Sequence, residues 1–492
     1  MPTPPHHHRN VVIIGAGPAG LTAAVELCRL NIPVTVLEKD TLVGGIARTG
    51  EYKGYHFDIG GHRFFTKVPE VEQFWHDLIG PDLLIRPRIS RIFYRGKFFD
   101  YPLRPLNALS NLGLLTSLQV MLSYLHAQVF PFPREDTFEE WVCNRFGRKL
   151  YSIFFKTYTE KVWGLPCSEI RAEWAAQRIQ GLSLPIAIKN ALFGPRGEKA
   201  IKTLIQQFHY PRRGPGMMWR AAEQFVQAHG GCVELESDVI ALRHTDGRIT
   251  DVVARRNGHE QWFRATDVIT SMPLAELIHK LDPPAPPEAL AAANGLTYRD
   301  FLTVMLIVNQ PSLFPDNWIY IHAPEVNVGR VQNFKNWSPE MVPDPATSSL
   351  GLEYFCTEGD ALWNMPDAEL IELGKREMEQ IGLICASDVR DGTVIRQPKA
   401  YPVYNGTYAG YLAAIKDYLS NFGNLQTVGR NGLHKYNNQD HSMLTAMLAV
   451  RNLLGEGESL DVWEVNTERS YHEEMRFPPH SALSADEAGS AF

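Results

Sequence analysis

At 492 residues, with 44% hydrophobic and 21% charged residues, the chain has the composition of a globular protein and the length for two or three domains. A formal net charge of −7 argues against nucleic acid or an anionic membrane as the main partner, so an anionic substrate would need a local cluster of arginines. Six cysteines occur singly, with no CxxC pair, which argues against a zinc site or disulfide framework and predicts free thiols in a reducing compartment.

The first residues, MPTPPHHHRN, contain no apolar segment typical of a signal peptide. The most apolar stretch, residues 112–130, is interrupted by Ser, Gln and His, whereas a membrane-spanning helix needs about 20 nearly unbroken apolar residues. We therefore interpret this stretch as a core or pocket helix. We expect a cytoplasmic protein with no stable membrane insertion and no metal site.

The N-terminal segment predicts a strand–turn–helix–strand unit. A buried strand (11–14) leads into the glycine-rich turn GAGPAG, a helix follows at about 18–30, and a second strand spans 34–38. The first glycine of such a turn permits a tight bend, the second lets backbone approach a pyrophosphate, and the third lets helix pack on strand. An acidic residue ending the second strand is placed to accept ribose hydroxyls. The predicted dinucleotide contacts are Gly15, Gly17, Ala19, Gly20, Glu38 and Lys39.

Two further glycine pairs follow, in LVGGIARTG (42–50) and DIGGHRFFTK (58–67). The first is similar to a stretch in flavoproteins of the amine-oxidase type, where backbone runs along the diphosphate. In the second, bare backbone would let the chain lie against an isoalloxazine, with a histidine over or beside the ring's reactive edge. These pairs predict FAD as the cofactor, with contacts from Gly45, Ile46, Ala47, Gly60, Gly61 and His62.

Farther along, residues 88–100 alternate like a hairpin, residues 105–200 are mostly helical, and a βαβ-like passage begins near 217. Strand-rich sequence spans about 300–410, and a glycine turn (428–432) leads to a last helix. We predict an α/β fold: a Rossmann-like (GR2-type) FAD-binding domain, discontinuous in sequence, with a mixed or antiparallel sheet domain for the substrate and a helical insertion. The predicted bounds are 8–88, 206–275 and 425–458 for the FAD domain, 89–104 and 295–424 for the sheet domain, 105–205 for the helical domain, and 1–7 and 468–492 for loose termini.

Five motifs occur in the order and rough spacing of the UDP-galactopyranose mutases: GGHRFFT, YRGKFFDYPL, YTEKVWG, YPVYNGT and GRNGLHKYNNQDHS. The chain resembles that family, within the wider amine oxidase and protoporphyrinogen oxidase superfamily, over about residues 10–455. The resemblance implies a mutase that interconverts pyranose and furanose forms of a nucleotide-activated sugar. Reduced flavin N5 would attack the anomeric carbon, with no net redox change. NAD(P)H is a possible external reductant.

The resemblance also implies roles for individual residues. It places His62 over the flavin, Trp163 beside the sugar, and Arg178 and Arg330 on the diphosphate, a task suited to forked, permanently charged guanidinium groups. The implied substrate-binding tyrosines are Tyr101, Tyr320, Tyr401 and Tyr436. The further flavin contacts are Gly429, Arg430, Asn438 and Gln439.

Three residues depart from the family pattern on the base and diphosphate contacts: Arg104, Trp337 and Gly329. These departures leave the nucleotide and the sugar open. The main alternative is an FAD-dependent oxidoreductase of the amine oxidase or protoporphyrinogen oxidase type, and a non-enzymatic escort protein of the same fold is a third. The expected partner is a small-molecule nucleotide sugar, and a homodimer is expected by analogy alone.

Overall fold

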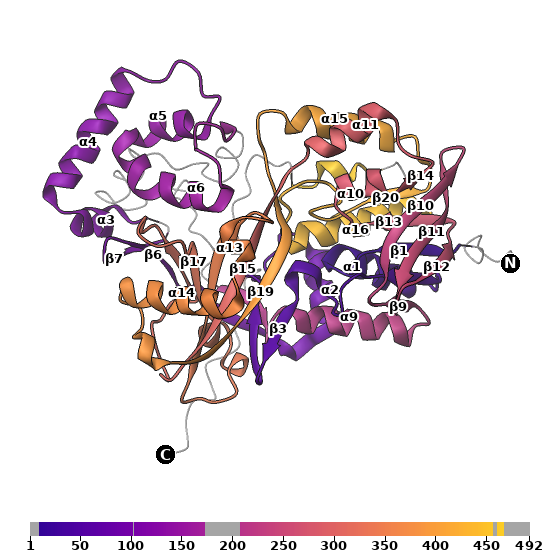
Figure 1. Cartoon of the computed structure of the whole chain (residues 1–492), viewed down its shortest axis with the longest axis horizontal. Coiled ribbons are helices and arrows are strands. Elements are labelled where there is room, and N and C mark those ends of the chain that lie inside the picture. Colours follow the sequence, from indigo (N-terminus) through magenta and orange to yellow (C-terminus); the bar gives the residue numbers. More distant parts are fainter. Residues whose placement is uncertain (1–8, 102, 173–206, 456–459, 467–492) are drawn as a thin grey trace, which may run out of the picture.

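The structure is a computed structural model that describes residues 9–101, 103–172, 207–455 and 460–466 (Figure 1). It contains a parallel sheet with helices, a large mixed sheet, and a lobe of helices, at the upper left of Figure 1, formed by residues 105–163. The predicted α/β class, with a discontinuous Rossmann-like unit, is confirmed. The exact domain bounds stay a prediction.

A five-stranded parallel sheet, in the order β20-β13-β1-β2-β9, forms the Rossmann-like unit. Its strands are β1 (Val11–Ile14), β2 (Val34–Leu37), β9 (Cys232–Glu234), β13 (Asp267–Thr270) and β20 (Leu425–Thr427). On one face pack the helices α1 (Pro18–Arg29), α2 (Pro69–Ile79), α9 (Gly216–Ala228) and α16 (Gln439–Leu454). Neighbouring strand residues face different cores, since Ile13 belongs to the cluster under these helices and Val12 to the cluster on the other face. Both faces are therefore covered, as the apolar run VVII predicts.

The second face is covered by a four-stranded sheet and three helices. The strands are β10 (Asp238–Thr245), β11 (Arg248–Arg256), β12 (His259–Arg264) and β14 (Leu281–Asp282), and the helices are α10 (Leu274–His279), α11 (Pro287–Gly295) and α15 (Tyr408–Leu419). Two small antiparallel pairs complete this half of the molecule: β3 (Thr49–Tyr52) with β4 (Tyr55–Asp58), and β5 (Leu83–Pro87) with β8 (Gln207–Pro211).

A seven-stranded mixed sheet, in the order β19-β15-β18-β17-β16-β6-β7, forms the second unit. Its strands are β6 (Ser90–Tyr94), β7 (Lys97–Asp100), β15 (Tyr298–Val308), β16 (Trp318–Ile321), β17 (Arg330–Asn333), β18 (Ser348–Cys356) and β19 (Val389–Pro402). The helices α12 (Phe334–Trp337), α13 (Ala361–Asn364) and α14 (Asp367–Gln380) accompany it. Every residue of β18, an interior strand of the sheet, is buried, so a charge on this strand is costly.

The helical lobe consists of α3 (Pro105–Leu112), α4 (Leu114–Val129), α5 (Phe138–Tyr151), a π-helical turn η4 (Ser152–Lys156) and α6 (Thr157–Trp163). Thr137 and Glu140 form a capping box that starts α5. Gly147, with a φ of +78°, bends α5 where a Cβ would lie 2.7 Å from the backbone nitrogen of Tyr124 on α4. The remaining short helical turns are η2 (Gly45–Ala47), η3 (Gly80–Asp82), η5 (Pro339–Met341), η6 (Ala386–Asp388) and η7 (Val462–Glu464).

Within the described residues, no single helix has both the length and the apolar composition to cross a membrane. Helices α3 and α4 meet that test only as a pair, and the pair is bent by 119° at Gly113.

Candidate functional site

The turn after β1 is a cradle of bare backbone. Gly15 has a φ of +96°, and a Cβ on Gly20 would stand 1.8 Å from the carbonyl oxygen of Gly15, so both positions require glycine. At Gly17 a Cβ would have one described neighbour within 4 Å, Gly45 Cα at 3.8 Å. The space over Gly17 is therefore open to a group from outside the chain, as a pyrophosphate requires. Ala19 lies buried in the first turn of α1.

Glu38 lies directly after β2 and is buried. Its carboxylate accepts the backbone N–H of Ala16 at 2.7 Å and that of Asp40 at 2.9 Å. The acid therefore reaches the glycine turn from the neighbouring strand, which is the position that ribose recognition requires. Lys39 follows it and is exposed.

The second glycine pair packs on the first turn. Gly44 donates its N–H to the carbonyl of Ala16 at 2.8 Å, and the φ of Gly45 is +53°. The guanidinium group of Arg48 donates to Gly45 O and to the side chain of Gln397, both at 2.9 Å, which fixes the segment against β19. The predicted contacts Gly45, Ile46 and Ala47 make up η2.

The third glycine pair lies between the two sheets. Gly60 has a φ of +83°, and a Cβ on it would lie 3.7 Å from the His62 ring and 3.9 Å from Arg330 Nη2. A Cβ on Gly61 would stand 2.9 Å from the side-chain nitrogen of Gln332. The bare backbone therefore lets this loop lie directly against β17 of the mixed sheet, with His62 beside it.

His62 is held in its neutral form. Burial, together with the positive charges of Arg430 and Arg330, lowers the pKa of His62 to about 3. At neutral pH the imidazole therefore offers one donor and one acceptor and carries no charge. Such a residue can orient a neighbouring group, but it is a weak proton donor.

Arg330 on β17 stands directly opposite Glu353 on β18. Its Nε lies 2.9 Å from both carboxylate oxygens, its Nη2 also bonds the carboxylate, and Gln332 donates to Glu353 at 2.8 Å. Burial opposes the charge on Arg330, but the fully buried Glu353 outweighs it, so the pKa of Arg330 lies well above its ordinary range. Within the described residues Nη1 has no hydrogen-bond partner, so the pair holds a guanidinium group in a fixed orientation beside Gly60.

Tyrosines surround this cation. Tyr158 on α6 contacts Tyr320 edge-on at 5.4 Å and stacks on His322 at 5.0 Å between ring centroids. Burial raises the pKa of Tyr158 well above its usual range, although Arg330 works in the opposite direction, and burial likewise raises the pKa of Tyr401. These hydroxyls therefore stay protonated and can donate hydrogen bonds to an anion.

A second aromatic group includes Tyr401, Tyr436 and Trp163. Tyr401 stacks on Tyr436 at 5.5 Å with 9° between the ring planes, and Trp163 lies 6.3 Å from both rings. The guanidinium carbon of Arg430 is 4.9 Å from the Tyr436 ring, while its nitrogens donate to backbone carbonyls at 2.9 Å. Four predicted residues from three distant segments are thus brought together.

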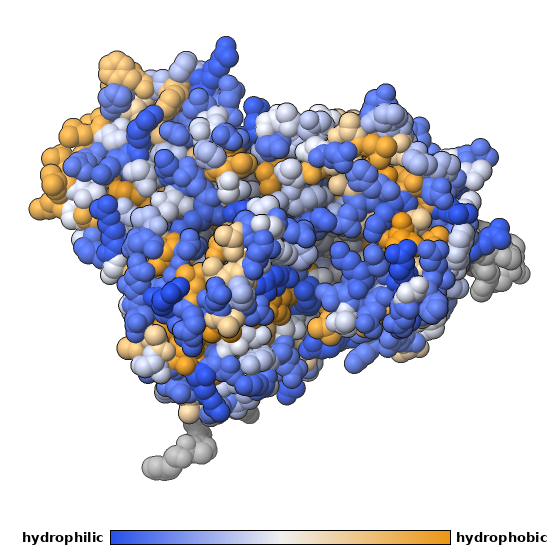
Figure 2. Space-filling model, in the orientation of Figure 1, coloured by the Kyte–Doolittle hydropathy of each residue, from blue (hydrophilic) through white to orange (hydrophobic). Residues whose placement is uncertain are grey.

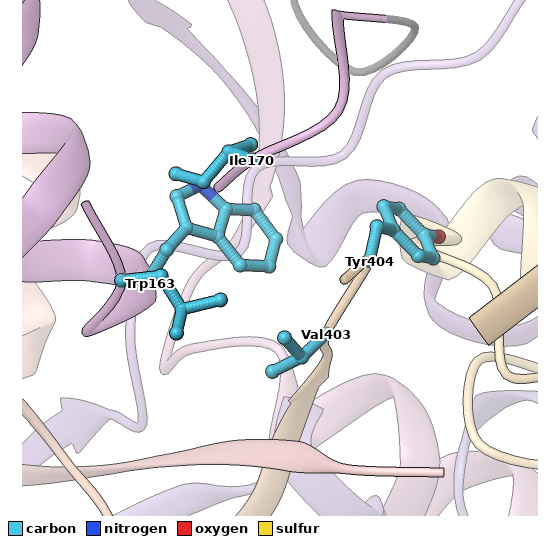
Figure 3. Close-up of a pocket in the computed structure, with 5 residues that line it drawn as sticks. Trp163, Ile170, Val403 and Tyr404 are labelled. Atoms are coloured by element: carbon cyan, nitrogen blue, oxygen red, sulfur yellow. The ribbon is translucent and has the colours of Figure 1, made fainter. Parts of the chain in front are cut away.

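An apolar pocket opens beside this group (Figure 3). Its interior space is about 10 Å³, within a hollow of about 200 Å³ that includes open solvent. The lining residues are Trp163, Leu165, Ile170, Val403 and Tyr404. In Figure 3 the Trp163 indole and the Tyr404 ring face each other across it, and Trp163 and Tyr404 are 6.4 Å apart between centroids. The pocket therefore adds a small, mainly apolar surface next to the arginine–tyrosine cluster.

The start of α16 approaches the loop of His62. Asn438 caps this helix, and Gln439 donates from its side chain to the carbonyl of Arg63 at 3.1 Å. Gly429, which a φ of +80° restricts to glycine, places its N–H 2.9 Å from the hydroxyl of Thr445 on the same helix. The helix N-terminus and its positive dipole end therefore point to the region between the glycine loops.

The remaining predicted residues lie farther out. Tyr101 is partly exposed, 5.0 Å from the Tyr320 ring and 5.4 Å from the guanidinium carbon of Arg88. Arg104 starts α3 with a side chain 79% exposed, near Asp100. Trp337 is fully buried, donates its indole N–H to Asn317 O at 2.9 Å and stacks on Trp318. Arg178 lies outside the described residues.

Sequence reasoning missed several members of the cluster. They are Arg63, Arg88, Tyr158, His322, Gln332 and Glu353. Glu353 carried a detectable signal, because it is the one charged residue in the apolar strand SSLGLEYFC. Arg63 and Tyr158 lie inside the motifs GGHRFFT and YTEKVWG. Arg63 follows the predicted site residue His62, and Tyr158 lies five positions before the predicted site residue Trp163.

The residues present fit FAD. The open space over Gly17 accepts a pyrophosphate, and Glu38 is placed for a ribose. Gln439 Oε1 is buried and has no hydrogen-bond partner in the described part of the chain, as expected of an atom that faces a polar ligand.

Comparisons with known proteins agree with this geometry. The family model described as flavin containing amine oxidoreductase matches residues 18–434. A crystal structure of reduced UDP-galactopyranose mutase is similar, with a TM-score of 0.77 and 21% identity over 94% of this chain and 100% of that one. A putative protoporphyrinogen oxidase from Exiguobacterium is similar with a TM-score of 0.69 and 17% identity over 91% of this chain and 99% of that one. At these identities the likeness shows the fold alone.

Among curated proteins, the probable UDP-galactopyranose mutase of Klebsiella pneumoniae is 25% identical over 177 residues, which are 34% of this chain and 44% of that protein. The curated relatives that the chain matches are covered over less than half of their own length.

Two glycine substitutions separate flavin binding from folding. We expect Gly17→Ala to fold with an unchanged melting temperature without flavin but to bind FAD at least about tenfold more weakly, because its methyl group occupies the pyrophosphate space. Gly20→Ala should instead destabilise the fold by at least about 3 kcal/mol, because its methyl group overlaps a backbone oxygen. Flavin absorbance and thermal melting measure both effects. Full FAD content in Gly17→Ala would contradict the cradle.

Asp440, in the first turn of α16, predicts a pH-dependent stability. Burial raises its pKa from 3.8 to about 7, against hydrogen bonds from His441 N–H and Thr66. Because the folded-state pKa is raised, the contribution of protonated Asp440 is complete below about pH 4 and is lost as the pH rises through about 7. The wild type should therefore lose roughly 4 kcal/mol relative to Asp440→Asn over this range and change no further above it. Denaturant melts of both proteins test this, and parallel curves would refute it.

Proposed function

The chain belongs to the flavin-containing amine oxidoreductase family, and from that premise we propose that it is an FAD-dependent mutase that interconverts ring forms of a nucleotide-activated sugar. The observation that carries the proposal is the cation of Arg330, which Glu353 holds beside Gly60 and His62. An oxidase of an uncharged substrate has no use for a half-buried guanidinium group held in one orientation at this place. A sugar diphosphate that leaves and returns has such a use.

When bound, FAD supplies the reactive ring edge, and the protein's task is to orient the sugar and stabilise the leaving diphosphate. Arg330 would bind the diphosphate through its free Nη1, and the protonated Tyr158 and Tyr401 would donate hydrogen bonds to its oxygens. Arg63 and Arg88 flank the outer side of the cluster, with their guanidinium carbons 5.9 Å and 5.4 Å from the Trp318 ring, and extend the positive region. Neutral His62 would orient groups at the ring edge without adding charge.

The sugar would lie against Trp163, Tyr401 and Tyr436, where flat rings exclude water. The nucleotide would extend toward Tyr101, where the cluster reaches the surface. Arg104 is exposed and Trp337 is fully enclosed, so neither side chain supports a specific choice of base. We therefore propose the diphosphate sugar as the substrate class and leave its base open. The six cysteines are free thiols, which supports action in a reducing compartment.

The apolar pocket in Figure 3 favours a second candidate, an FAD-dependent oxidoreductase. Its lining of Trp163, Ile170 and Val403 suits a non-polar group from which hydride is removed. In that case Arg330 would bind a carboxylate or phosphate group at the other end of the substrate.

One experiment separates these candidates. The flavin-loaded protein is reduced with dithionite in the absence of oxygen, UDP-galactopyranose or UDP-galactofuranose is added, and products are separated by chromatography. We expect interconversion by the reduced protein alone, because the proposed reaction would require reduced FAD, and no bleaching of the oxidised flavin by either sugar. If an amine or another organic substrate bleaches the oxidised flavin and air restores it with formation of peroxide, while neither sugar isomerises, the oxidoreductase is correct.

A further inference from the structure

The outer face of the helical lobe exposes a large amount of apolar surface. More than half of the exposed large hydrophobic side chains in the described residues belong to α3, α4 and the residue after them. Figure 2 shows this patch along the upper left edge of the molecule, where Figure 1 places α4. Its centre, which we term the leucine face, consists of Leu114, Leu115, Leu118, Leu122, Leu125 and Val129.

The leucine face is not needed to pack the lobe. From Leu115 to Val129 its members recur every three or four residues and form one stripe along α4. The buried residues Ser117, Val120 and Ala127 form the opposite stripe, which packs against α5. Leu114 is 93% exposed, so the face has no cover within the described residues. Patches of this extent mark a surface that binds a partner.

Charge separates this face from its surroundings. Residues 105–133 contain no Asp, Glu, Lys or Arg, whereas residues 95–150 as a whole contain seven cations and five carboxylates, in a chain of net charge −7. Lys97 donates to the carbonyl of Asn111 at the end of α3, and Arg148 lies 5.8 Å from the ring of Phe132 just beyond α4. The uncharged face is therefore bordered by charged residues with an excess of two cations, of which Arg148 also lies 3.8 Å from Glu139.

We propose that the leucine face docks into the surface of a lipid bilayer that contains anionic headgroups, without spanning it. The bend of 119° at Gly113 makes Leu114 and Leu115 a projecting corner, and the 16 residues of α4 extend about 24 Å from it. Lipid acyl tails form no hydrogen bonds, so a surface of leucine side chains can enter them without polar partners. A stable protein interface, in contrast, carries hydrogen-bonding groups around its apolar centre. Arg95, Lys97 and Arg148 would bind the headgroup phosphates.

This inference goes beyond the proposed function and does not depend on it. The lobe that carries the leucine face also contributes Trp163 to the pocket, and one hydrophobic cluster includes both Val120 of α4 and Trp163. Docking would therefore hold the pocket near the lipid surface.

Flotation of the flavin-loaded full chain with vesicles tests the proposal. The wild type should float with vesicles of equal parts phosphatidylcholine and phosphatidylglycerol, and more weakly with phosphatidylcholine alone. Leu118→Gln/Leu122→Gln should bind at least about tenfold more weakly, because two leucines no longer enter the tails. The matched control, Leu30→Gln/Ile85→Gln, alters two exposed apolar residues outside the lobe and should bind like the wild type. Arg95→Gln/Arg148→Gln should lose most of the preference for phosphatidylglycerol.

Flavin absorbance and melting temperature establish that each variant is folded. Failure of the wild type to float with either vesicle would overturn the proposal, as would equal binding by Leu118→Gln/Leu122→Gln. Light scattering without lipid tests whether the face instead binds a second copy of the chain. That would be the conclusion if the wild type does not float and is a dimer, and if Leu118→Gln/Leu122→Gln converts the dimer to a monomer. If Leu118→Gln/Leu122→Gln misfolds, Arg95→Gln/Arg148→Gln alone tests the proposal. An undiminished preference of this variant for phosphatidylglycerol vesicles would then contradict the proposal.

Discussion

The ion pair between Arg330 and Glu353 is the constraint on which the site depends. The two residues are directly opposed on neighbouring strands at the centre of the mixed sheet, and Glu353 has no exposure to solvent. Taking either charge alone into this interior would cost several kcal/mol, so each is stable there only with the other. The result is a guanidinium group with one fixed orientation and one unused nitrogen. Little reorganisation is then needed when an anion arrives.

The glycine loops bring the two halves of the molecule together around this charge. The glycine turn at residues 15–20 packs on the pair Gly44–Gly45, whose segment Arg48 ties to β19, and the pair Gly60–Gly61 lies against β17. The loop with Gly60 touches both sides, since it follows β4 and lies within 4 Å of Arg330 at the position of its missing Cβ. The surfaces that we propose for flavin and for substrate are therefore adjacent.

The fold class and the geometry of the glycine turn were predictable from the sequence, because they depend on local rules. Gly15, Gly20 and Glu38 occupy positions that backbone geometry and strand ends determine. The residue opposite Arg330 was not predictable in the same way. Glu353 is 23 positions away along the chain, and only the pairing of β17 with β18 shows that the two meet.

Other residues show the limit of a resemblance. Trp337 occupies a family position whose role is to contact substrate, yet here its ring is enclosed by Phe208, Tyr210 and Trp318. A motif fixes a place in the chain, but the neighbouring side chains decide whether that place faces a ligand. The net charge of the whole chain was similarly uninformative about local surfaces. The chain has a net charge of −7, yet residues 95–150 carry two more cations than carboxylates.

The most direct test of the central claim is the binding of UDP to the flavin-loaded variant Arg330→Met/Glu353→Gln, which removes both charges together and leaves no unpaired buried ion. Titration followed by flavin fluorescence should give a Kd at least about tenfold weaker than that of the wild type, with FAD content and melting temperature retained. An unchanged Kd for UDP in the folded, yellow variant would show that this cation does not bind the diphosphate, and the account of the site would be wrong.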